Sequence, residues 1–363
     1  MSKNSNVLMI GPFPEPTTGV SLANHVVKSI LEQSSDRYTV KHINTSYNRF
    51  DENVGGFTFH KLFFNLKFYL KFGQVFGCDI LYLTPGQSFF GVLKYSVFLL
   101  AGALSRKKII THIHGNHLAT TYHSLKGLKK VVFKRLLSKS TKGIVLSKSL
   151  IPNMDAFVGK ERTYVLPNFA EDYLYKNTQE KSYDSLKVVY LSNLMKEKGI
   201  LDLIEALKML EKNNVTYTAK IAGSIDKEHK EIILREIKQL KHTTYLGIVR
   251  GDSKKELLQW GTTFVLPTYY TMEGQPISIL EALAAGNGII TTRHAGIPDV
   301  IKDTIHGAFV NKQNPQEIYE ELSILAINPE KMQQIGEGNR IFFKENYTKD
   351  IFKDRLLEIF ETK

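Results

Sequence analysis

Two carboxylates, Glu273 and Glu281, flank a short segment rich in small residues in the second half of the chain. Pro276 lies between them and suits a helix start, because proline lacks an N–H that the first helical turn would leave unpaired. The apolar runs at residues 264–268 and 288–292 predict two buried strands around the segment. We therefore expect a strand, a loop with Glu273, a helix with Glu281 and a second strand.

The expected helix start offers free backbone N–H groups and a partial positive charge, which suit a phosphate or diphosphate. A carboxylate at this end would repel the anion directly. Glu273 is therefore better suited to accept hydrogen bonds from sugar or ribose hydroxyls beside the anion. The alternative is that Glu273 is a simple helix-start charge and Glu281 a solvated helix residue, and the residues alone leave both interpretations open.

The segment resembles the E-x7-E signature of retaining nucleotide-sugar glycosyltransferases of family 4. That family has the GT-B fold, in which two Rossmann-like domains face each other across a cleft. The matching residues are Glu273, Gly274, Pro276, Ser278, Leu280, Glu281, Ala282 and Gly286. The resemblance implies that Glu273 faces the donor sugar and that Glu281 holds the ribose. It also implies that the diphosphate and sugar hydroxyls meet the backbone between them, at Gly274, Gln275, Pro276, Ile277 and Ser278.

Other parts of the chain match landmarks of the same family in the expected order. Thr18-Gly19 stands where the family has a Gly-Gly pair beside the donor diphosphate and the acceptor, so only Gly19 matches. His114-Gly115 matches a pair that supplies an active-site histidine near the donor sugar. Pro167-Asn168 resembles the turn between the two domains. These matches imply that His114 acts on the donor sugar together with Glu273.

The loop after the first strand of the second half carries a further match and a departure. Lys198 matches a lysine that neutralises the diphosphate and completes the expected catalytic set, but Asn193 stands where the family has an arginine. A charged hydrogen-bond donor is worth roughly twice a neutral one, so Arg250 or Lys196 would have to compensate. Ile248 matches a position that holds the base through backbone groups, and a core position explains Ile248 equally well.

The net charge of +12 lies entirely in the first half of the chain. Residues 1–167 contain 22 Lys and Arg against 8 Asp and Glu, which gives +14, whereas residues 168–363 have a net charge of −2. This asymmetry predicts an anionic partner for the first half, either a membrane surface or a nucleic acid. No zinc-finger or RNP-type aromatic signature accompanies the charge, which favours anionic lipid.

Two segments of the first half combine basic and apolar residues. Residues 57–76 are dominated by Phe, Leu and Tyr with interspersed lysines, and residues 120–142 predict a basic amphipathic helix. Both are candidates for a membrane interface; the alternatives are a core helix and an ordinary surface helix. The expected acceptor and membrane contacts are Thr18, Lys61, Lys67, Lys71, His117, Lys129, Lys130, Lys134 and Arg135.

The length of 363 residues predicts two domains, and regular alternation of strands and helices predicts an α/β fold with doubly wound parallel sheets. We expect an N-terminal Rossmann-like domain at residues 1–167, facing the acceptor and the membrane. A nucleotide-sugar-binding Rossmann-like domain should follow at residues 168–347, and a last helix at about 348–363 should pack back on the first. Cys78 is the only cysteine, which excludes an internal disulfide and is compatible with a reducing cytoplasm. No charge-free stretch reaches the roughly 18–20 residues of a membrane span.

The sequence and the resemblance together predict a retaining hexosyltransferase. It would move a hexose or N-acetylhexosamine from a nucleotide-sugar, with UDP as the expected nucleotide, to a lipid-linked or saccharide acceptor in bacterial surface polysaccharide or glycan biosynthesis. We expect a cytoplasmic protein, peripheral on the inner face of the cytoplasmic membrane, without a nucleic-acid partner. The sequence has no DxD pair, so neither a metal nor a cofactor is implied. The alternative, kept open by Asn193, is a non-catalytic membrane- or nucleic-acid-binding module with a degenerate transferase fold.

Overall fold

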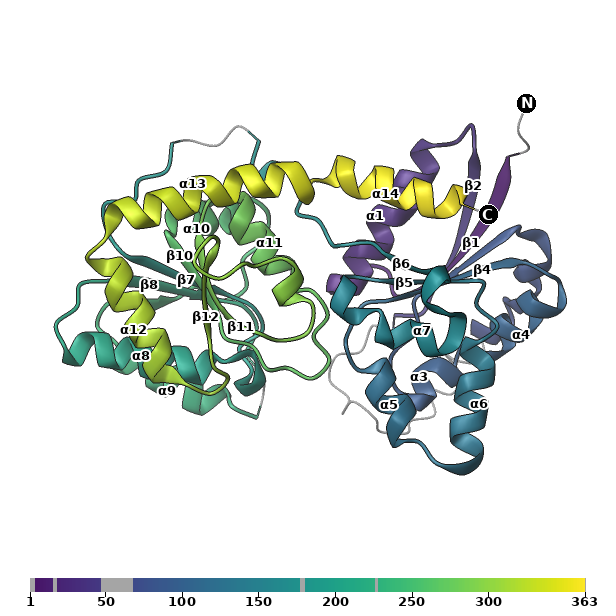
Figure 1. Cartoon of the computed structure of the whole chain (residues 1–363), viewed down its shortest axis with the longest axis horizontal. Helices are drawn as coiled ribbons and strands as arrows, with labels where there is room; N and C mark the ends of the chain where they lie inside the picture. The colour runs from purple at the N-terminus through teal and green to yellow at the C-terminus, as the bar shows by residue number, and fades with distance from the viewer. Residues whose placement is uncertain (1–3, 16–17, 47–67, 177–179, 226–227, 363) are drawn as a thin grey trace. The chain divides into compact units, whose positions relative to one another are not determined.

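The computed structural model of the chain describes residues 4–15, 18–46, 68–176, 180–225 and 228–362. The chain folds into two compact units, Met1–Pro167 with Lys353–Lys363, and Asn168–Phe352. Each unit contains one six-stranded parallel sheet. Helices cover both faces of each sheet, so the strands are continuous apolar runs rather than alternating ones (Figure 1). The expected α/β class with two Rossmann-like domains is confirmed.

The sheet of the first unit begins with β1, which lies one strand in from an edge, and it grows in both directions from there. Its order is β2 (Tyr38–Asn44), β1 (Ser5–Gly11), β3 (Ile80–Leu83), β4 (Lys108–Ile113), β5 (Lys142–Val145) and β6 (Thr163–Val165). The chain runs from β1 to β2 at one edge and then crosses to β3 on the other side of β1. In open α/β sheets such a switch point opens a crevice at the carboxyl ends of the strands. The loops after β1 and β4 lie at that end.

The helices of the first unit correct one expectation. They are α1 (Gly19–Gln33), α3 (Phe89–Leu93), α4 (Ser96–Leu104), α5 (Leu118–Ser124), α6 (Gly127–Leu137) and α7 (Pro152–Val158), with 3-10 turns η1 (Phe72–Gly77), η2 (Lys148–Leu150) and η3 (Lys160–Arg162). The single basic helix expected at residues 120–142 is two helices, α5 and α6. Leu125 is extended, and Gly127 has a φ of +52°, a left-handed conformation that cannot continue a helix. Of the expected interfacial helix at 57–76, residues 57–67 lie outside the described part.

The second unit repeats the same plan. Its sheet order is β12 (Gly307–Val310), β11 (Gly288–Thr292), β10 (Thr263–Leu266), β7 (Lys187–Leu191), β8 (Thr218–Ala222) and β9 (Thr243–Tyr245). The chain builds β7, β8 and β9 in one direction and then crosses back to pair β10 with β7. The switch point therefore lies between β7 and β10, and the loops after these two strands flank it.

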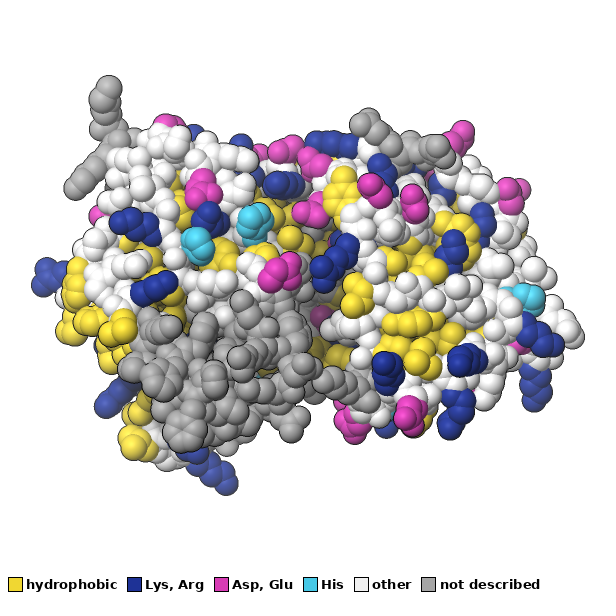
Figure 2. Space-filling model, turned by 180° about the vertical axis from the view of Figure 1, so that it is seen from behind, with side chains coloured by type: hydrophobic (Ala, Val, Ile, Leu, Met, Phe, Trp, Pro, Cys, Tyr) yellow, Lys and Arg dark blue, Asp and Glu magenta, His cyan; other side chains and the backbone are white. Residues whose placement is uncertain are grey.

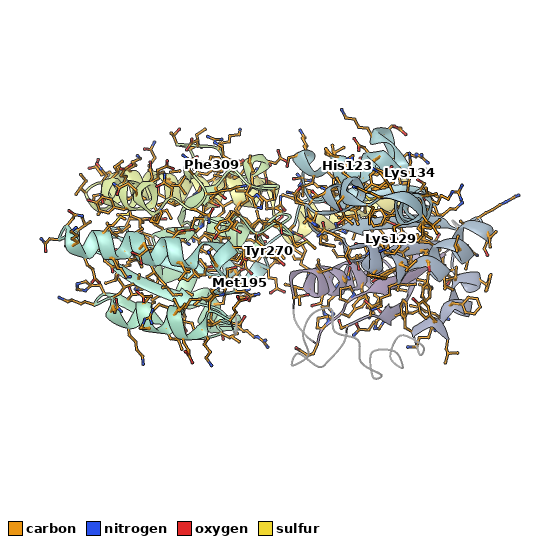
Figure 3. The ribbon with its side chains drawn as sticks, turned by 90° about the horizontal axis from the view of Figure 1, so that it is seen from below. His123, Lys129, Lys134, Met195, Tyr270 and Phe309 are labelled. Carbon is orange, nitrogen blue, oxygen red and sulfur yellow. The ribbon has the colours of Figure 1, made fainter. Side chains whose placement is uncertain are left out.

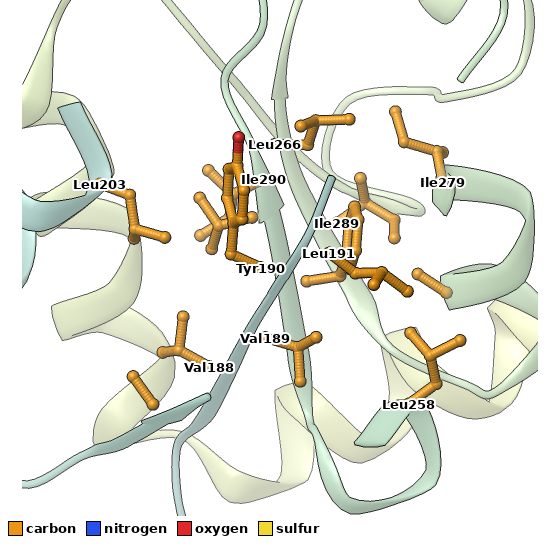
Figure 4. Packing of buried hydrophobic residues seen from close by; sticks show 14 of the residues in the cluster. Val188, Val189, Tyr190, Leu191, Leu203, Leu258, Leu266, Ile279, Ile289 and Ile290 are labelled. Atoms are coloured by element: carbon orange, nitrogen blue, oxygen red, sulfur yellow. The ribbon is translucent and has the colours of Figure 1, made fainter. Parts of the chain in front are cut away.

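The helices of the second unit enclose its core. They are α8 (Ile200–Lys212), α9 (Lys230–Gln239), α10 (Gly251–Trp260), α11 (Ile277–Ala284), α12 (Pro315–Ala326) and α13 (Pro329–Asn346), with 3-10 turns η4 (Asp172–Leu174), η5 (Lys196–Lys198) and η6 (Ile297–Asp299). Figure 4 shows Leu203 of α8 on one side of β7, and Leu258 of α10 and Ile279 of α11 on the other. All three are buried against the sheet.

The last helix, α14 (Lys349–Glu361), ends on the first unit. Lys108 Nζ at the start of β4 donates to the Phe360 carbonyl at 2.5 Å, and Lys142 Nζ at the start of β5 donates to the Ile359 carbonyl at 2.7 Å. The two ammonium groups satisfy carbonyls that the helix end leaves unpaired and oppose its negative dipole. Within the described ranges, no helix is both long and apolar enough to cross a bilayer.

Candidate functional site

A buried ion pair lies at the switch point of the second sheet. Lys198 Nζ, from the loop after β7, is 2.5 Å from Glu273 Oε2, from the loop after β10, and the two side chains are only 14% and 10% exposed. The Thr268 hydroxyl donates to the same carboxylate oxygen at 3.4 Å. Lys198 Nζ also lies 5.1 Å from the centroid of the Tyr270 ring, and Figure 3 labels Tyr270. Two residues that are 75 positions apart in sequence thus present opposite charges at one point.

Close backbone packing fixes the loop that carries Lys198. Gly199 has a φ of +78°, and a Cβ at this position would meet the Pro267 carbonyl oxygen at 2.6 Å. The Tyr190 hydroxyl donates to the carbonyls of Asn193 and Lys198 at 3.2 and 3.3 Å. Burial raises the pKa of Tyr190 well above its usual value, which keeps this hydroxyl a donor.

The Gln275 side chain has a structural role that the sequence analysis did not predict. Its Oε1 accepts the backbone N–H of Asn168 at 2.6 Å, and its carbonyl accepts Asn168 Nδ2 at 2.9 Å. The neighbouring Gly274 carbonyl accepts the N–H of Gly296 at 2.8 Å. These bonds commit the Gln275 side chain to holding the loop ahead of α11, while its backbone remains in the candidate site.

The start of α11 has the features that suit an anion. Pro276 is its N-cap residue and provides no side-chain cap, and the first turn contains no carboxylate. Ile277 and Ser278 are half-buried, whereas the rest of the helix is buried. The first N–H groups of α11 therefore keep their hydrogen-bonding capacity and positive partial charge for a ligand.

Glu281 lies one turn further along α11 and has a partner that the sequence did not reveal. Its Oε1 is 2.5 Å from Lys254 Nζ of α10. Tyr173 of η4 completes the group, with its ring centroid 5.8 Å from the same ammonium. No spacing in the sequence relates positions 173, 254 and 281, so only the packing of η4, α10 and α11 could identify Lys254 and Tyr173.

His294, after β11, is a third residue that the sequence analysis did not select. Its Nε2 donates to the Tyr270 carbonyl at 2.8 Å, so neutral Nδ1 accepts from Lys312 Nζ at 3.0 Å. Burial lowers the pKa of His294, and Lys312 lowers it further. Lys312 also lines a surface hollow with Arg293 and Phe309. The position of His294 directly after a strand at the carboxyl edge was the signal that could have indicated it.

The structure shows the surroundings of Ile248 and Asn193, whose roles the sequence leaves open. Ile248 is 62% exposed, so the alternative core position is wrong. Asn193 is also exposed, and its Oδ1 accepts the Ser224 hydroxyl at 2.8 Å, which directs the amide. Arg250, the N-cap residue of α10, and Lys196 of η5 are both exposed, and no contact among the described residues places either beside Lys198.

A histidine pair lies at the carboxyl end of β4 in the first unit. The rings of His112 and His114 have centroids 3.9 Å apart. His112 Nδ1 is 2.6 Å from the Tyr82 hydroxyl; burial raises the pKa of Tyr82, so the hydroxyl donates. Burial lowers the pKa of His114 to about 4. His114 is therefore neutral at pH 7, where it can exchange hydrogen bonds but carries no charge.

Other predicted residues of the first unit have structural partners. Thr18 is the N-cap of α1: its hydroxyl oxygen accepts the Ser21 N–H at 3.1 Å, and its own N–H donates to Ser21 Oγ at 2.7 Å. Gly19 is the first residue of that helix. His117 is the N-cap of α5, and its N–H donates to Gln87 Oε1 at 2.6 Å. The Thr18 side chain is committed to capping, which limits its availability to an acceptor.

The first unit also presents a surface that combines apolar and basic side chains. Exposed apolar residues on α3, α4 and α6 include Phe90, Val97, Leu100, Leu104, Leu128 and Val131. Lys129, Lys134 and Arg135 of α6 are exposed and Lys130 is half-buried, while Lys71 is exposed ahead of η1; Lys61 and Lys67 lie outside the described residues. Figure 2 shows hydrophobic and basic side chains next to one another on this unit, and Figure 3 labels Lys129 and Lys134. The sequence has 12 Lys and Arg but no Asp or Glu between Asp79 and Asp155.

Comparison with known proteins agrees with this geometry. Residues 174–342 match the model of the family described as glycosyl transferases group 1. An uncharacterized glycosyltransferase of Methanocaldococcus jannaschii is 26% identical over 249 residues, 67% of each chain. Anabaena HepE, solved in complex with UDP and glucose, has a TM-score of 0.74 over 99% of this chain and 100% of that one, at 16% identity. These matches support a glycosyltransferase with the GT-B fold.

A further relative of this chain has a named reaction. The N,N'-diacetylbacillosaminyl-diphospho-undecaprenol alpha-1,3-N-acetylgalactosaminyltransferase of Campylobacter jejuni is 28% identical over 174 residues, 48% of this chain and 44% of that enzyme. The matched family segment contains Lys198, Lys254, Glu273 and Glu281. The expected GT-B fold is thus confirmed, and the group 1 match covers the unit that holds the buried ion pair.

Proposed function

We propose that this protein is a retaining glycosyltransferase that moves a hexose or N-acetylhexosamine from a nucleotide-sugar to a lipid-linked or saccharide acceptor. The observation that carries the proposal is the Lys198–Glu273 pair beside the uncapped start of α11. A cation and a helix N-terminus at one switch point suit a diphosphate, and a buried carboxylate next to them suits sugar hydroxyls. UDP is the proposed nucleotide, a choice supported by the structural likeness to a UDP-binding protein.

Each residue has a distinct role in the proposed reaction. Lys198 and the first N–H groups of α11 stabilise the diphosphate as it leaves. Glu273 accepts hydrogen bonds from the donor sugar, Glu281 holds the ribose and the backbone at Ile248 meets the base. Neutral His114 and Gly19 of the first unit contact the donor. The reaction requires neither a metal nor another cofactor, because Lys198 and the helix dipole meet the charge of the diphosphate.

Retention of configuration follows from how the acceptor is activated. No side chain in the described part of the candidate site stands out as a nucleophile, so the acceptor hydroxyl attacks on the face that the diphosphate leaves. The departing phosphate oxygen accepts the hydroxyl proton, and an oxocarbenium-like centre forms in between. Glu273 positions the sugar and stabilises the positive charge on that centre.

The proposal is tested by donor binding and transfer. A panel of UDP-, GDP- and ADP-sugars is screened for thermal stabilisation, because a ligand that binds only the folded state raises the unfolding temperature. Transfer or slow donor hydrolysis is then measured with the stabilising donor, and anomeric NMR of the product reports the configuration. Wild-type protein that binds no nucleotide-sugar would contradict the proposal and favour a non-catalytic module.

We further propose that the acceptor lies at an anionic membrane surface, with the protein peripheral on the cytoplasmic face. Support comes from the exposed apolar residues of α3, α4 and α6, and from the absence of acidic residues between Asp79 and Asp155. Apolar side chains at the headgroup boundary and lysines near anionic lipid each favour binding, by about 1 kcal/mol per basic residue. The lipid-linked acceptor of the Campylobacter relative is consistent with such a location.

Vesicle sedimentation tests the membrane proposal by itself. We expect the wild type to sediment with vesicles containing phosphatidylglycerol and to remain in the supernatant with phosphatidylcholine alone. Leu100→Ser/Leu104→Ser and Lys129→Ser/Lys134→Ser should each weaken sedimentation. Ile324→Ser/Ile327→Ser, which removes two exposed apolar residues of the second unit, is the matched control. Equal binding to both kinds of vesicle, or to none, would exclude an anionic lipid partner.

A further inference from the structure

Lys254 and Glu281 form a second buried ion pair, away from Lys198 and Glu273. Lys254 belongs to the first half of α10 and Glu281 to the middle of α11. Their side chains are 17% and 7% exposed, and Nζ lies 2.5 Å from Oε1. Burial alone would lower the pKa of Lys254, but Glu281 and Tyr173 raise it above its usual value. The lysine is therefore charged at neutral pH.

The pair leaves one carboxylate oxygen of Glu281 for a ligand. Among the described residues, Lys254 is the only side chain that donates a hydrogen bond to Glu281, and it binds Oε1. Ile277, Ser278 and Glu281 are spaced by three and four residues, so they share one face of α11. The first two are half-buried rather than buried. Glu281 thus lies on the same face of α11 as the two partly exposed residues at the start of the helix, where a diphosphate would bind.

A carboxylate with this burial is costly to ionise unless a cation lies beside it. Lys254 provides that cation and also fixes the orientation of the carboxylate. The Tyr173 ring of η4, with its centroid 5.8 Å from the same ammonium, gives Lys254 a second favourable contact. A carboxylate positioned in this way can accept hydrogen bonds from neighbouring hydroxyls with little further loss of side-chain conformational entropy.

We infer that Lys254 is a positioning residue for ribose recognition: it binds Oε1 of Glu281 and directs Oε2 toward the 2′ and 3′ hydroxyls of the nucleotide. The inference rests on the proposed function, because it assigns the ribose to Glu281. It adds a residue from a different helix, and it predicts that nucleotide selectivity depends on a side chain that does not touch the nucleotide.

The competing explanation is that the pair only joins α10 to α11. The second unit contains a suitable control for this, since Lys208 of α8 binds Glu236 of α9 at 2.7 Å and likewise joins two helices. Loss of either pair can change the unfolding temperature. Only the Lys254 pair should change the discrimination between nucleotides that have or lack ribose hydroxyls.

The test is calorimetric binding of nucleoside diphosphates by the full-length chain. UDP, GDP and ADP are measured with the wild type, and the tightest is compared with its 2′,3′-dideoxy form. Lys254→Gln should weaken the ribonucleotide by roughly tenfold or more, as expected for loss of a hydrogen bond to an ionised group, and bring the two affinities close together. Lys254→Arg should retain most of the discrimination, and Lys208→Gln all of it. Lys254→Met answers the same question if the glutamine variant does not fold.

The outcomes separate the inference from the proposed function. If the wild type binds none of the three nucleotides, both are overturned. If the wild type discriminates against the dideoxy form and Lys254→Gln discriminates equally well, the proposed function stands and the role of Lys254 is wrong. A lower unfolding temperature with unchanged discrimination identifies the pair as structural only.

Discussion

Asn168 and Gln275 are joined by two hydrogen bonds, from the Asn168 N–H to Gln275 Oε1 at 2.6 Å and from Asn168 Nδ2 to the Gln275 carbonyl at 2.9 Å. Both side chains are buried. The first residue of the second unit thereby holds the loop that leads into α11 and carries Glu273. The turn at position 168 and the carboxylate motif, separate in the sequence, are one structural assembly.

Gln275→Ala should lower the free energy of unfolding and weaken donor binding together. The substitution leaves the buried Asn168 N–H without its acceptor, which costs about 1–3 kcal/mol. Chemical denaturation and calorimetric donor binding measure the two effects. Gln333→Ala, at an exposed position on α13, is the control and should change neither. A stable Gln275→Ala protein would mean that the loop holds its shape without this contact.

Lys198→Met should reduce transfer by at least about a hundredfold, since it removes the cation that stabilises the leaving diphosphate. It should also destabilise the fold by roughly 3–5 kcal/mol, because Glu273 is left buried without its partner. The double variant Lys198→Met/Glu273→Gln should recover stability but not activity. Lys28→Met, which breaks the more exposed Lys28–Glu32 pair of α1, should cost about 1 kcal/mol or less. Transfer rates close to wild type in Lys198→Met would contradict the proposed site.

Stability should fall as the pH decreases through the titration range of His114. Burial lowers the pKa of His114 to about 4 in the folded chain, whereas an unfolded histidine titrates near 6.5. Below about pH 6.5 the unfolded chain therefore binds a proton that the folded chain does not. The stability contributed by neutral His114 is complete above that pH and is lost by on the order of 3 kcal/mol as the pH approaches 4.

Denaturation curves between pH 7.5 and 4.5 measure this dependence, and histidine NMR assigns it. His114→Gln should lose less stability than the wild type over the range. His123→Gln, which changes an exposed histidine of α5, should retain the wild-type slope. An NMR titration midpoint near 6.5 for His114 would show that the ring is solvated rather than buried.

Gly199→Ala should destabilise the second unit more than Gly247→Ala does. Both glycines have left-handed φ angles, +78° and +71°, so both substitutions carry a similar backbone strain of about 1–2 kcal/mol. At Gly199 the new Cβ also meets the backbone of Pro267, whereas the space around Gly247 is open. Gly199→Ala should in addition reduce donor affinity, because it displaces Lys198. Equal loss of stability in the two variants would show that the approach to Pro267 is relaxed at no cost.

The sequence alone determined the α/β class, the strand, loop and helix unit around Glu273 and the basic character of the first half. These properties depend on local patterns: apolar runs of strand length, a proline at a helix start, and charge counts. The sequence also assigned Lys198 and Glu273 to the same site. That assignment came from the family resemblance and not from the spacing of the two residues. Local periodicity was less reliable at residues 120–142, where Gly127 divides the expected helix into α5 and α6.

Only the tertiary structure decided which side chains meet. The order of the strands in the second sheet brings together three groups of residues. These groups are Lys254 with Glu281, Asn168 with Gln275, and His294 with Tyr270 and Lys312. A parallel sheet brings the carboxyl ends of its strands to one edge, whatever their separation along the chain. The partners of Gln275 and Glu281 therefore come from packing and strand order, which determine whether each side chain holds a loop or is left with an oxygen for a ligand.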